Sequence, residues 1–234
     1  MLRCLLSEGA IESPVRMDNN GHRKGDAEML GGDRANPPAG ERKYYTLEID
    51  YAGASRLAIH QWVNKSEQMK GFHPAHEQPF RGLRFAEPPQ IEFVRSRKLS
   101  ALRDAESVTL GIWLISDRLK NLIEQLDAEA FVFQPVIVDY SRFPEAGPAY
   151  WFVYIMRTLD CVDEERSVIR YQDDPPGIKN YLGLGDVRMR PEVVGSAHAF
   201  RLIYATTRLI VDDIIVDALR AEKIRGFRFQ PIQA

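Results

Sequence analysis

The chain has 234 residues, 44% of them hydrophobic, which is enough to bury one large core or two small ones. A net charge of −2 gives no general attraction for nucleic acid, because phosphate binding usually requires concentrated Lys and Arg. The sequence has no run of the roughly 18 uninterrupted apolar residues that a membrane helix needs. These features exclude an embedded protein and argue against direct nucleic-acid binding.

Residues 1–40 differ from the rest of the chain because they carry turn signals without any apolar period. Asn36-Pro-Pro-Ala-Gly40 is the clearest example. We therefore predict a disordered or weakly ordered leader over 1–40 and a single α+β domain over 41–234. With Cys4 and Cys161 as the only cysteines, a structural disulfide is not expected, and the expected location is the reducing cytoplasm.

The domain begins with a segment rich in aromatic and branched residues, Tyr44–Ile49, which predicts a first strand. Tyr150–Met156 is apolar on both faces and too short for most helices, so it predicts a central strand. Ser167–Tyr171 is its expected hairpin partner, and Phe200–Tyr204 alternates like another strand. The predicted fold class is α+β, with a mostly antiparallel sheet and a few short helices.

A short sequence occurs twice and indicates a duplicated unit. Phe131-Val-Phe-Gln-Pro135 recurs as Phe227-Arg-Phe-Gln-Pro231, each time shortly after an amphipathic helical pattern. Ser116 and Asp117 in the first copy, and Asp212 and Asp213 in the second, stand where helix caps are expected. Proline closes each strand because it cannot continue a ladder. We therefore predict two similar units, each made of a capped short helix, a tight turn and a strand.

The residue types that usually carry chemistry give no recognisable motif. His73 and His76 form a close pair without a third ligand, so we predict no metal site. Gly183-Leu-Gly185 lacks the third glycine of a dinucleotide fingerprint, which predicts a turn and no cofactor. Cys161 has no neighbouring histidine and should pack as a small apolar residue, while His198 should have a hydrogen-bonded structural role. The sequence therefore predicts no catalytic residues.

An acidic group follows the predicted central strand and is the one ambiguous feature. Carboxylates of this kind can hold a divalent cation, act as an acid/base pair or steer a basic partner. The competing interpretation is a solvated turn, in which Asp160 and Asp163 orient the backbone through hydrogen bonds. The candidate residues are Asp160, Asp163, Glu164, Glu165, Asp173 and Asp174.

Several motifs, taken in order, carry a resemblance. They are the helical stretch Ile115–Leu126, then Phe133-Gln-Pro135, Tyr150–Tyr154, Leu159-Asp-Cys-Val-Asp163 with Ser167, and Phe200-Arg-Leu202. In this order and spacing, residues 44–234 resemble immunity protein family eleven of bacterial polymorphic toxin systems.

The resemblance implies a non-catalytic protein that protects the producing cell during interbacterial competition. It would bind the carboxy-terminal domain of a cognate toxin and neutralise it by stoichiometric occlusion. Toxins linked to such families include many nucleases. On this hypothesis the six acidic residues are the expected contact surface. Two alternatives stay open: a regulatory or protein-binding module, and a metal-dependent hydrolase that uses Asp160 and Asp163.

Overall fold

The computed structural model describes residues 42–52, 59–70, 85, 87–94, 98–109, 111–172, 177 and 179–232. The chain divides into two compact units, and every described residue belongs to the second, Asn36–Ala234. The expected leader over 1–40 lies outside the described residues. Strands with mostly antiparallel pairing dominate the second unit and a few short helices accompany them, which confirms the α+β class.

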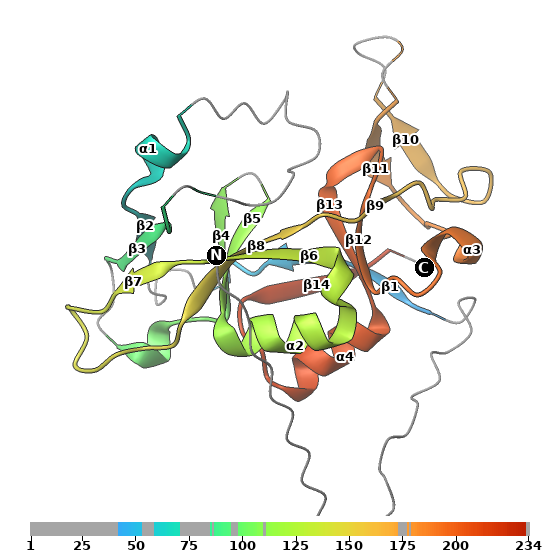
Figure 1. The fold of residues 1–234 in the computed structure, drawn as a ribbon. Coiled ribbons are helices and arrows are strands. Elements are labelled where there is room, and N and C mark those ends of the chain that lie inside the picture. Colours follow the sequence, from blue (N-terminus) through green and yellow to red (C-terminus); the bar gives the residue numbers. More distant parts are fainter. Residues whose placement is uncertain are drawn as a thin grey trace, which may run out of the picture. The chain divides into compact units, whose positions relative to one another are not determined.

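A four-stranded antiparallel sheet carries the first predicted helix–strand unit (Figure 1). Its strands in spatial order are β4 (Ala105–Thr109), β5 (Ile112–Ser116), β8 (Tyr150–Ile155) and β6 (Phe131–Pro135). Helix α2 (Asp117–Asp127) follows β5 at once, because the Ser116 side chain caps it by accepting a hydrogen bond from the Leu119 amide. A 3-10 turn, η3 (Ala128–Ala130), leads into β6. Strand β8 lies between β5 and β6, as expected for a central strand.

A five-stranded sheet carries the second unit. Its strands in spatial order are β14 (Phe227–Pro231), β1 (Tyr44–Ile49), β13 (Ala205–Asp212), β12 (Ala199–Leu202) and β9 (Thr158–Leu159), of which β9 alone runs parallel to its neighbour. Helix α4 (Asp213–Ala221) follows β13, with Asp212 accepting from the Ile215 amide. Gly226, at φ +120°, connects α4 to β14 where a Cβ would collide with the Ala105 carbonyl.

The two sheets repeat the same strand pairing, which confirms the predicted duplication. The cap residue Ser116 lies opposite Tyr150 in the first sheet, and the cap residue Asp212 lies opposite Tyr44 in the second. Strands β6 and β14 each pair with the central strand over their whole length. The central strands β8 and β1 also share one alternation of buried and half-buried residues. The repeat therefore includes four strands and a helix.

The central strands are exchanged between the two halves of the chain. In sequence, β1 precedes β4, β5, α2 and β6, and β8 precedes β12, β13, α4 and β14 in the same order. Nevertheless β1 pairs with β13 and β14, whereas β8 pairs with β5 and β6. Each half therefore supplies the strand that completes the sheet of the other.

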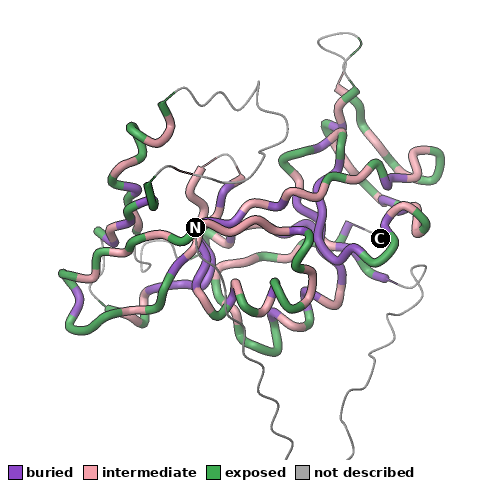
Figure 2. The backbone as a smooth tube through the Cα atoms, viewed as in Figure 1, coloured by how far each residue is buried: buried purple, intermediate pink, exposed green. Residues whose placement is uncertain are grey.

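Helices α2 and α4 lie side by side and share one core with both sheets (Figure 1). Leu119 and Ile123 of α2 and Ile215, Val216 and Leu219 of α4 are buried in it, which accounts for the apolar spacing of both helices. Figure 2 shows that buried residues follow the strands of the two sheets. No helix among the described residues is long and apolar enough to cross a membrane.

Two additional parts pack on these sheets, and we call them the first and second arm. The first arm contains β2 (His60–Trp62), α1 (Lys65–Gln68), β3 (Gln90–Phe93), η2 (Leu99–Ala101) and β7 (Ile137–Asp139). The second arm is the segment 160–198, with β10 (Ile169–Tyr171), β11 (Tyr181–Leu184) and α3 (Pro191–Val194). Separate hydrophobic clusters join each arm to the adjacent sheet.

Two local predictions are wrong at the second arm. Ser167–Tyr171 does not pair with the central strand, because both edges of β8 are already occupied by β5 and β6, and β10 pairs with β11 instead. Gly183 lies in strand β11 and not in a turn.

Candidate functional site

The acidic turn of the second arm is anchored by two buried residues. Cys161 and Val162 pack in the hydrophobic cluster beneath it. The Arg190 amide donates to the Cys161 carbonyl at 2.7 Å, and the Asp163 amide donates to the Arg188 carbonyl at 2.8 Å. These bonds fix the backbone on both sides of Val162, so the neighbouring carboxylates are presented from a defined position.

Glu164 is the most strongly bound of these carboxylates. Its oxygens form an ion pair with Lys179 and accept hydrogen bonds from the hydroxyls of Tyr181 and, at 2.9 Å, Tyr171. The Lys179 ammonium and the Tyr181 hydroxyl lower the pKa of Glu164 to about 2. Glu164 therefore ties the turn to the β10–β11 ribbon and is ionised at neutral pH.

Asp160 and Asp163 have partners closer to the turn itself. The Asp160 carboxylate lies 3.3 Å from the Arg190 guanidinium. The Asp163 carboxylate accepts a hydrogen bond from the Arg166 amide at 3.2 Å, and its second oxygen lies 3.9 Å from the Arg166 side chain. Asp163 thus makes the backbone contact that a turn-orienting residue would make.

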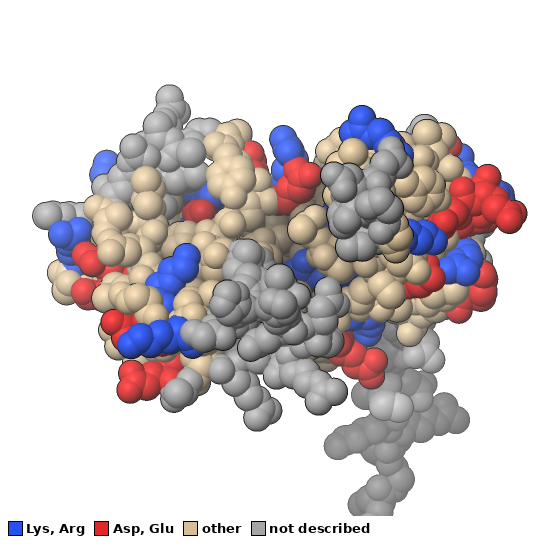
Figure 3. All heavy atoms as spheres, turned by 90° about the horizontal axis from the view of Figure 1, so that it is seen from above, with Lys and Arg blue, Asp and Glu red and all other residues tan. Residues whose placement is uncertain are grey.

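These residues line a groove of about 600 Å³, roughly twice the volume of the cavities of about 260 and 300 Å³ beside α2. Five acidic and three basic side chains surround it: Asp160, Asp163, Glu164, Glu165 and Glu192 against Arg166, Lys179 and Arg190. Figure 3 shows acidic and basic side chains gathered together at the side that carries the second arm. The surface expected to be negative is therefore partly neutralised by cations from other parts of the arm.

Two of the groove's carboxylates, Glu165 and Glu192, are exposed and have no ion pair or hydrogen bond to any residue that the structure describes. Each of the three groove cations is paired with an acid of the same arm. The groove can therefore offer free negative charge to a partner. Two predicted members, Asp173 and Asp174, lie outside the described residues.

The other chemical candidates have structural surroundings. Cys161 is fully buried, its sulfur lies 3.6 Å from that of Met189, and burial raises the pKa of the thiol to about 12, so it packs as a small apolar residue as predicted. Among the described residues, no group of three or more His, Cys, Asp or Glu side chains is placed to hold a metal ion. His73 and His76 lie outside the described residues.

Comparison with known families gives one decisive match. The model of the immunity protein family Imm11 matches residues 43–234, which include nearly all of the described fold and the whole second arm. The chain belongs to the Imm11 family. Comparison with curated proteins gives no match. Membership of Imm11 indicates an immunity function with a toxin as the partner, and it points to a non-enzymatic protein.

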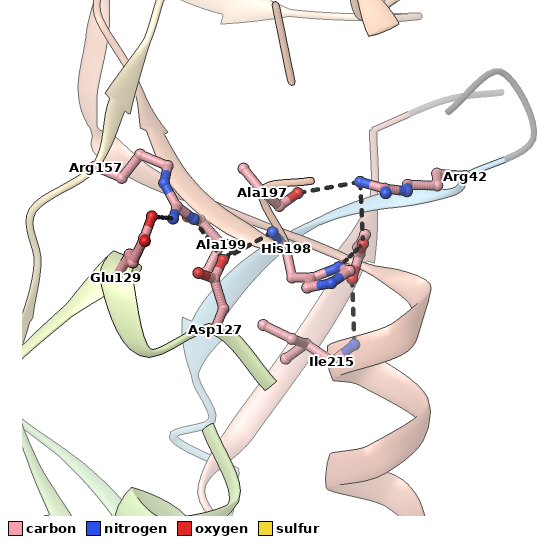
Figure 4. A network of polar contacts seen from close by, with 9 residues as sticks. Arg42, Asp127, Glu129, Arg157, Ala197, His198, Ala199 and Ile215 are labelled. Carbon is pink, nitrogen blue, oxygen red and sulfur yellow. Dashed lines mark hydrogen bonds and ion pairs between the residues drawn. The ribbon is translucent and has the colours of Figure 1, made fainter. Parts of the chain in front are cut away.

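A second polar cluster of this Imm11 chain lies in its interior (Figure 4). Asp212 is wholly buried, and its carboxylate lies 2.6 Å from His198 Nδ1 and 3.8 Å from the Arg42 guanidinium while it caps α4. Nearby, the Asp127 carboxylate accepts from the His198 amide at 2.8 Å and from the Arg157 guanidinium. The cluster holds the start of β12 against both helices of the repeat.

The predicted structural role of His198 agrees with these contacts, but its partners were not visible in the sequence. Asp212 was identifiable, together with Asp213, as a candidate helix cap, but not as a partner of His198, and no sequence feature pointed to Asp127 or Arg42. Separation along the chain hides them, because Arg42 and Asp127 reach the strand from distant segments.

Proposed function

We propose that this Imm11 protein neutralises one cognate toxin domain by forming a stoichiometric complex that blocks the toxin's active site. The observation that carries the proposal is the family match over residues 43–234, since an immunity protein acts by protecting its own cell from a toxin. No catalytic step by this chain is needed, because a tightly bound protein that covers an active site prevents turnover.

Occlusion of this kind requires a preorganised surface. Stable protein complexes commonly bury about 1,600 Å² in total, and rigid interfaces lose less conformational entropy on binding. The turn at Asp160–Glu165 meets the need for rigidity, because its backbone is hydrogen-bonded to the backbone of Arg188 and Arg190. We propose as contact residues Asp160, Asp163, Glu164, Glu165, Asp173 and Asp174.

The proposed partner is the carboxy-terminal domain of a toxin from a polymorphic toxin system, and the proposed setting is the cytoplasm of the producing bacterium. A nuclease is the favoured class of toxin, because a nucleic-acid-binding surface is basic and exposed carboxylates such as Glu165 would accelerate its association. Charge steering of this type weakens as salt screens the field.

Co-expression with the product of the adjacent upstream gene tests the function. We expect cells carrying both genes to survive, cells carrying the upstream gene alone to die, and the two proteins to co-purify in fixed stoichiometry. Survival without a complex would contradict occlusion. Death of the co-expressing cells would contradict immunity against that product, and a non-toxic binding partner would favour the alternative of a regulatory module.

A further inference from the structure

Exposed large hydrophobic side chains are unevenly distributed over the described fold. They are Ile59, Val63, Val94 and Ile137 in or beside the first arm, Val168, Tyr171 and Leu182 in the second arm, Ile203 in the β12–β13 turn, and Tyr51 just after β1. None lies in α2, α4, β6 or β14. The large apolar residues of α2, α4, β6 and β14 are thus buried or half-buried, whereas each arm also carries exposed ones, which is typical of a scaffold carrying interaction surfaces.

The second arm displays its apolar residues on a built surface. Val168 and Leu182 are 67% and 51% exposed. Two glycines leave room beside Val168, which precedes β10, and beside Arg170 of β10: a Cβ at Gly185 would lie 3.0 Å from Val168 Cβ, and one at Gly183 would lie 3.4 Å from Arg170 Cβ. The absence of a side chain at Gly185 therefore lets Val168 pack beside the end of β11 while its methyl groups stay exposed to a partner.

Glu164 connects this ribbon to the groove. Tyr171 from β10 and Tyr181 from β11 both donate to its carboxylate, and Lys179 pairs with it. The Lys179 ammonium also lies 4.3 Å from the centre of the Tyr204 ring. Because these contacts hold the ribbon and the acidic turn together, the exposed residues of the ribbon and the free carboxylates of the groove belong to one connected part of the second arm.

The charges of the groove indicate which partner suits this surface. Arg166, Lys179 and Arg190 are each paired within the arm, so the free charge is that of Glu165 and Glu192. A partner carboxylate would face this excess of negative charge, whereas a Lys or Arg would find acceptors that need no rearrangement of existing pairs.

We propose that the second arm is the docking surface for the toxin domain, with Val168 and Leu182 as apolar contacts and Glu165 and Glu192 as receivers of a basic side chain. The proposal rests on the immunity function proposed above and deepens it by naming the surface. The toxin face that fits is a protein surface with Lys or Arg beside apolar side chains. Affinity comes mainly from the apolar contacts, and the carboxylates accelerate association.

The test compares matched charge substitutions in the full chain. V168D/L182D places two carboxylates on the second arm, and V63D/I137D places two at positions of similar exposure, 51% and 55%, on the first arm. The probe is the purified toxin domain encoded next to this gene, inactivated by a substitution in its active site. Dissociation constants come from calorimetry, and melting temperatures check that each variant is folded.

We expect V168D/L182D to weaken binding at least about 100-fold, as for central contacts of an interface, and V63D/I137D to weaken it less than about 3-fold. If V168D/L182D lowers the melting temperature strongly, V168A/L182A replaces it, with a loss of about 10-fold or more expected. An effect below about 3-fold in the folded second-arm variant, or an equal loss in both arms, overturns the proposal.

The two free carboxylates of the groove, Glu165 and Glu192, are tested separately through the association rate. E165K/E192K should reduce the association rate constant more than about 10-fold at low salt and much less at high salt, because steering by exposed charge is screened. An unchanged association rate constant would show that Glu165 and Glu192 are not part of the docking surface. If the wild-type protein itself does not bind the toxin domain, the proposed function is wrong. If it binds and the second-arm variants bind equally well, only the proposed docking surface is wrong.

Discussion

At the residue scale, the two helix caps are supported by equivalent side chains of different chemistry. Asp104 accepts a hydrogen bond from the Ser116 hydroxyl at 2.8 Å just before the first hairpin. In the second unit His198 takes that place and lies 2.6 Å from the cap residue Asp212. In the first unit the acid precedes the hairpin, and in the second unit the acid is the cap residue itself. In both units the cap residue contacts the residue that precedes the hairpin.

Replacing Asp212 should therefore cost far more than replacing an exposed aspartate. D212A removes the cap of α4 and leaves Arg42 and His198 without their buried acceptor, so we expect a loss of about 3 kcal/mol in the free energy of unfolding. The control D217A, on the same helix with a 75% exposed side chain, should change it by less than about 0.5 kcal/mol. Urea unfolding measures both, and equal small losses would contradict a supporting role for the cluster.

Glu164 should make stability fall in acid. Its pKa is lowered from 4.5 to about 2 in the folded chain by Lys179 and Tyr181, so its contribution is complete above the unfolded value and disappears as pH falls from about 4.5 towards 2. E164Q, which cannot ionise, should unfold at a lower temperature at neutral pH and show a smaller drop across that window. Melting curves between pH 2 and 7 test this. Parallel curves for wild type and E164Q would show that Glu164 is not stabilised in its ionised form.

At the element scale, the duplication was predictable and the strand exchange was not. Phe131-Val-Phe-Gln-Pro135 and its second copy stand out in the sequence because local constraints act on both: a helix ends, a turn follows and proline closes the strand. The exchanged strands, Tyr44–Ile49 and Tyr150–Ile155, share little beyond their first and last residues. Their partners are chosen by packing between distant segments, which a local pattern does not encode.

The repeat predicts that side chains at equivalent positions contribute similarly to the free energy of unfolding. Phe133 and Phe229 occupy the same place in β6 and β14, and a helix cation lies over each ring: Lys120 at 5.1 Å and Arg220 at 5.5 Å. Because both rings are only partly buried, F133A and F229A should each cost about 2 kcal/mol and differ by less than about 1 kcal/mol. Chemical denaturation of the two variants provides the comparison. A large loss in one and none in the other would mean that the units have diverged in their packing.

At the scale of the whole molecule, the family was predictable and the arrangement of the second arm was not. The resemblance seen in motif order over residues 44–234 agrees with the family match over 43–234. The acidic turn was also visible, but its pairing with Lys179 and Arg190 was not, because those cations lie beyond the turn along the chain. The sequence therefore located a charged surface and overstated its negative character.

Substitutions in the duplicated scaffold and substitutions in the arms are expected to have different effects. Substitutions in the shared core of α2, α4 and the two sheets act on folding, because each half of the chain completes the sheet of the other. Substitutions in the groove of the second arm act on exposed charges such as Glu165 and Glu192. If the second arm is the docking surface proposed above, its exposed residues are free to differ with the partner while the duplicated scaffold keeps its pairing.

Titration of the toxin domain with this protein tests the central claim most directly. The toxin activity is measured while the Imm11 protein is added in steps at concentrations well above the dissociation constant. Stoichiometric occlusion predicts that activity falls in a straight line and reaches zero at a fixed molar ratio, with a complex of the same ratio on a sizing column. Undiminished activity at large excess, or inhibition by trace amounts of this protein without a complex, would contradict the account.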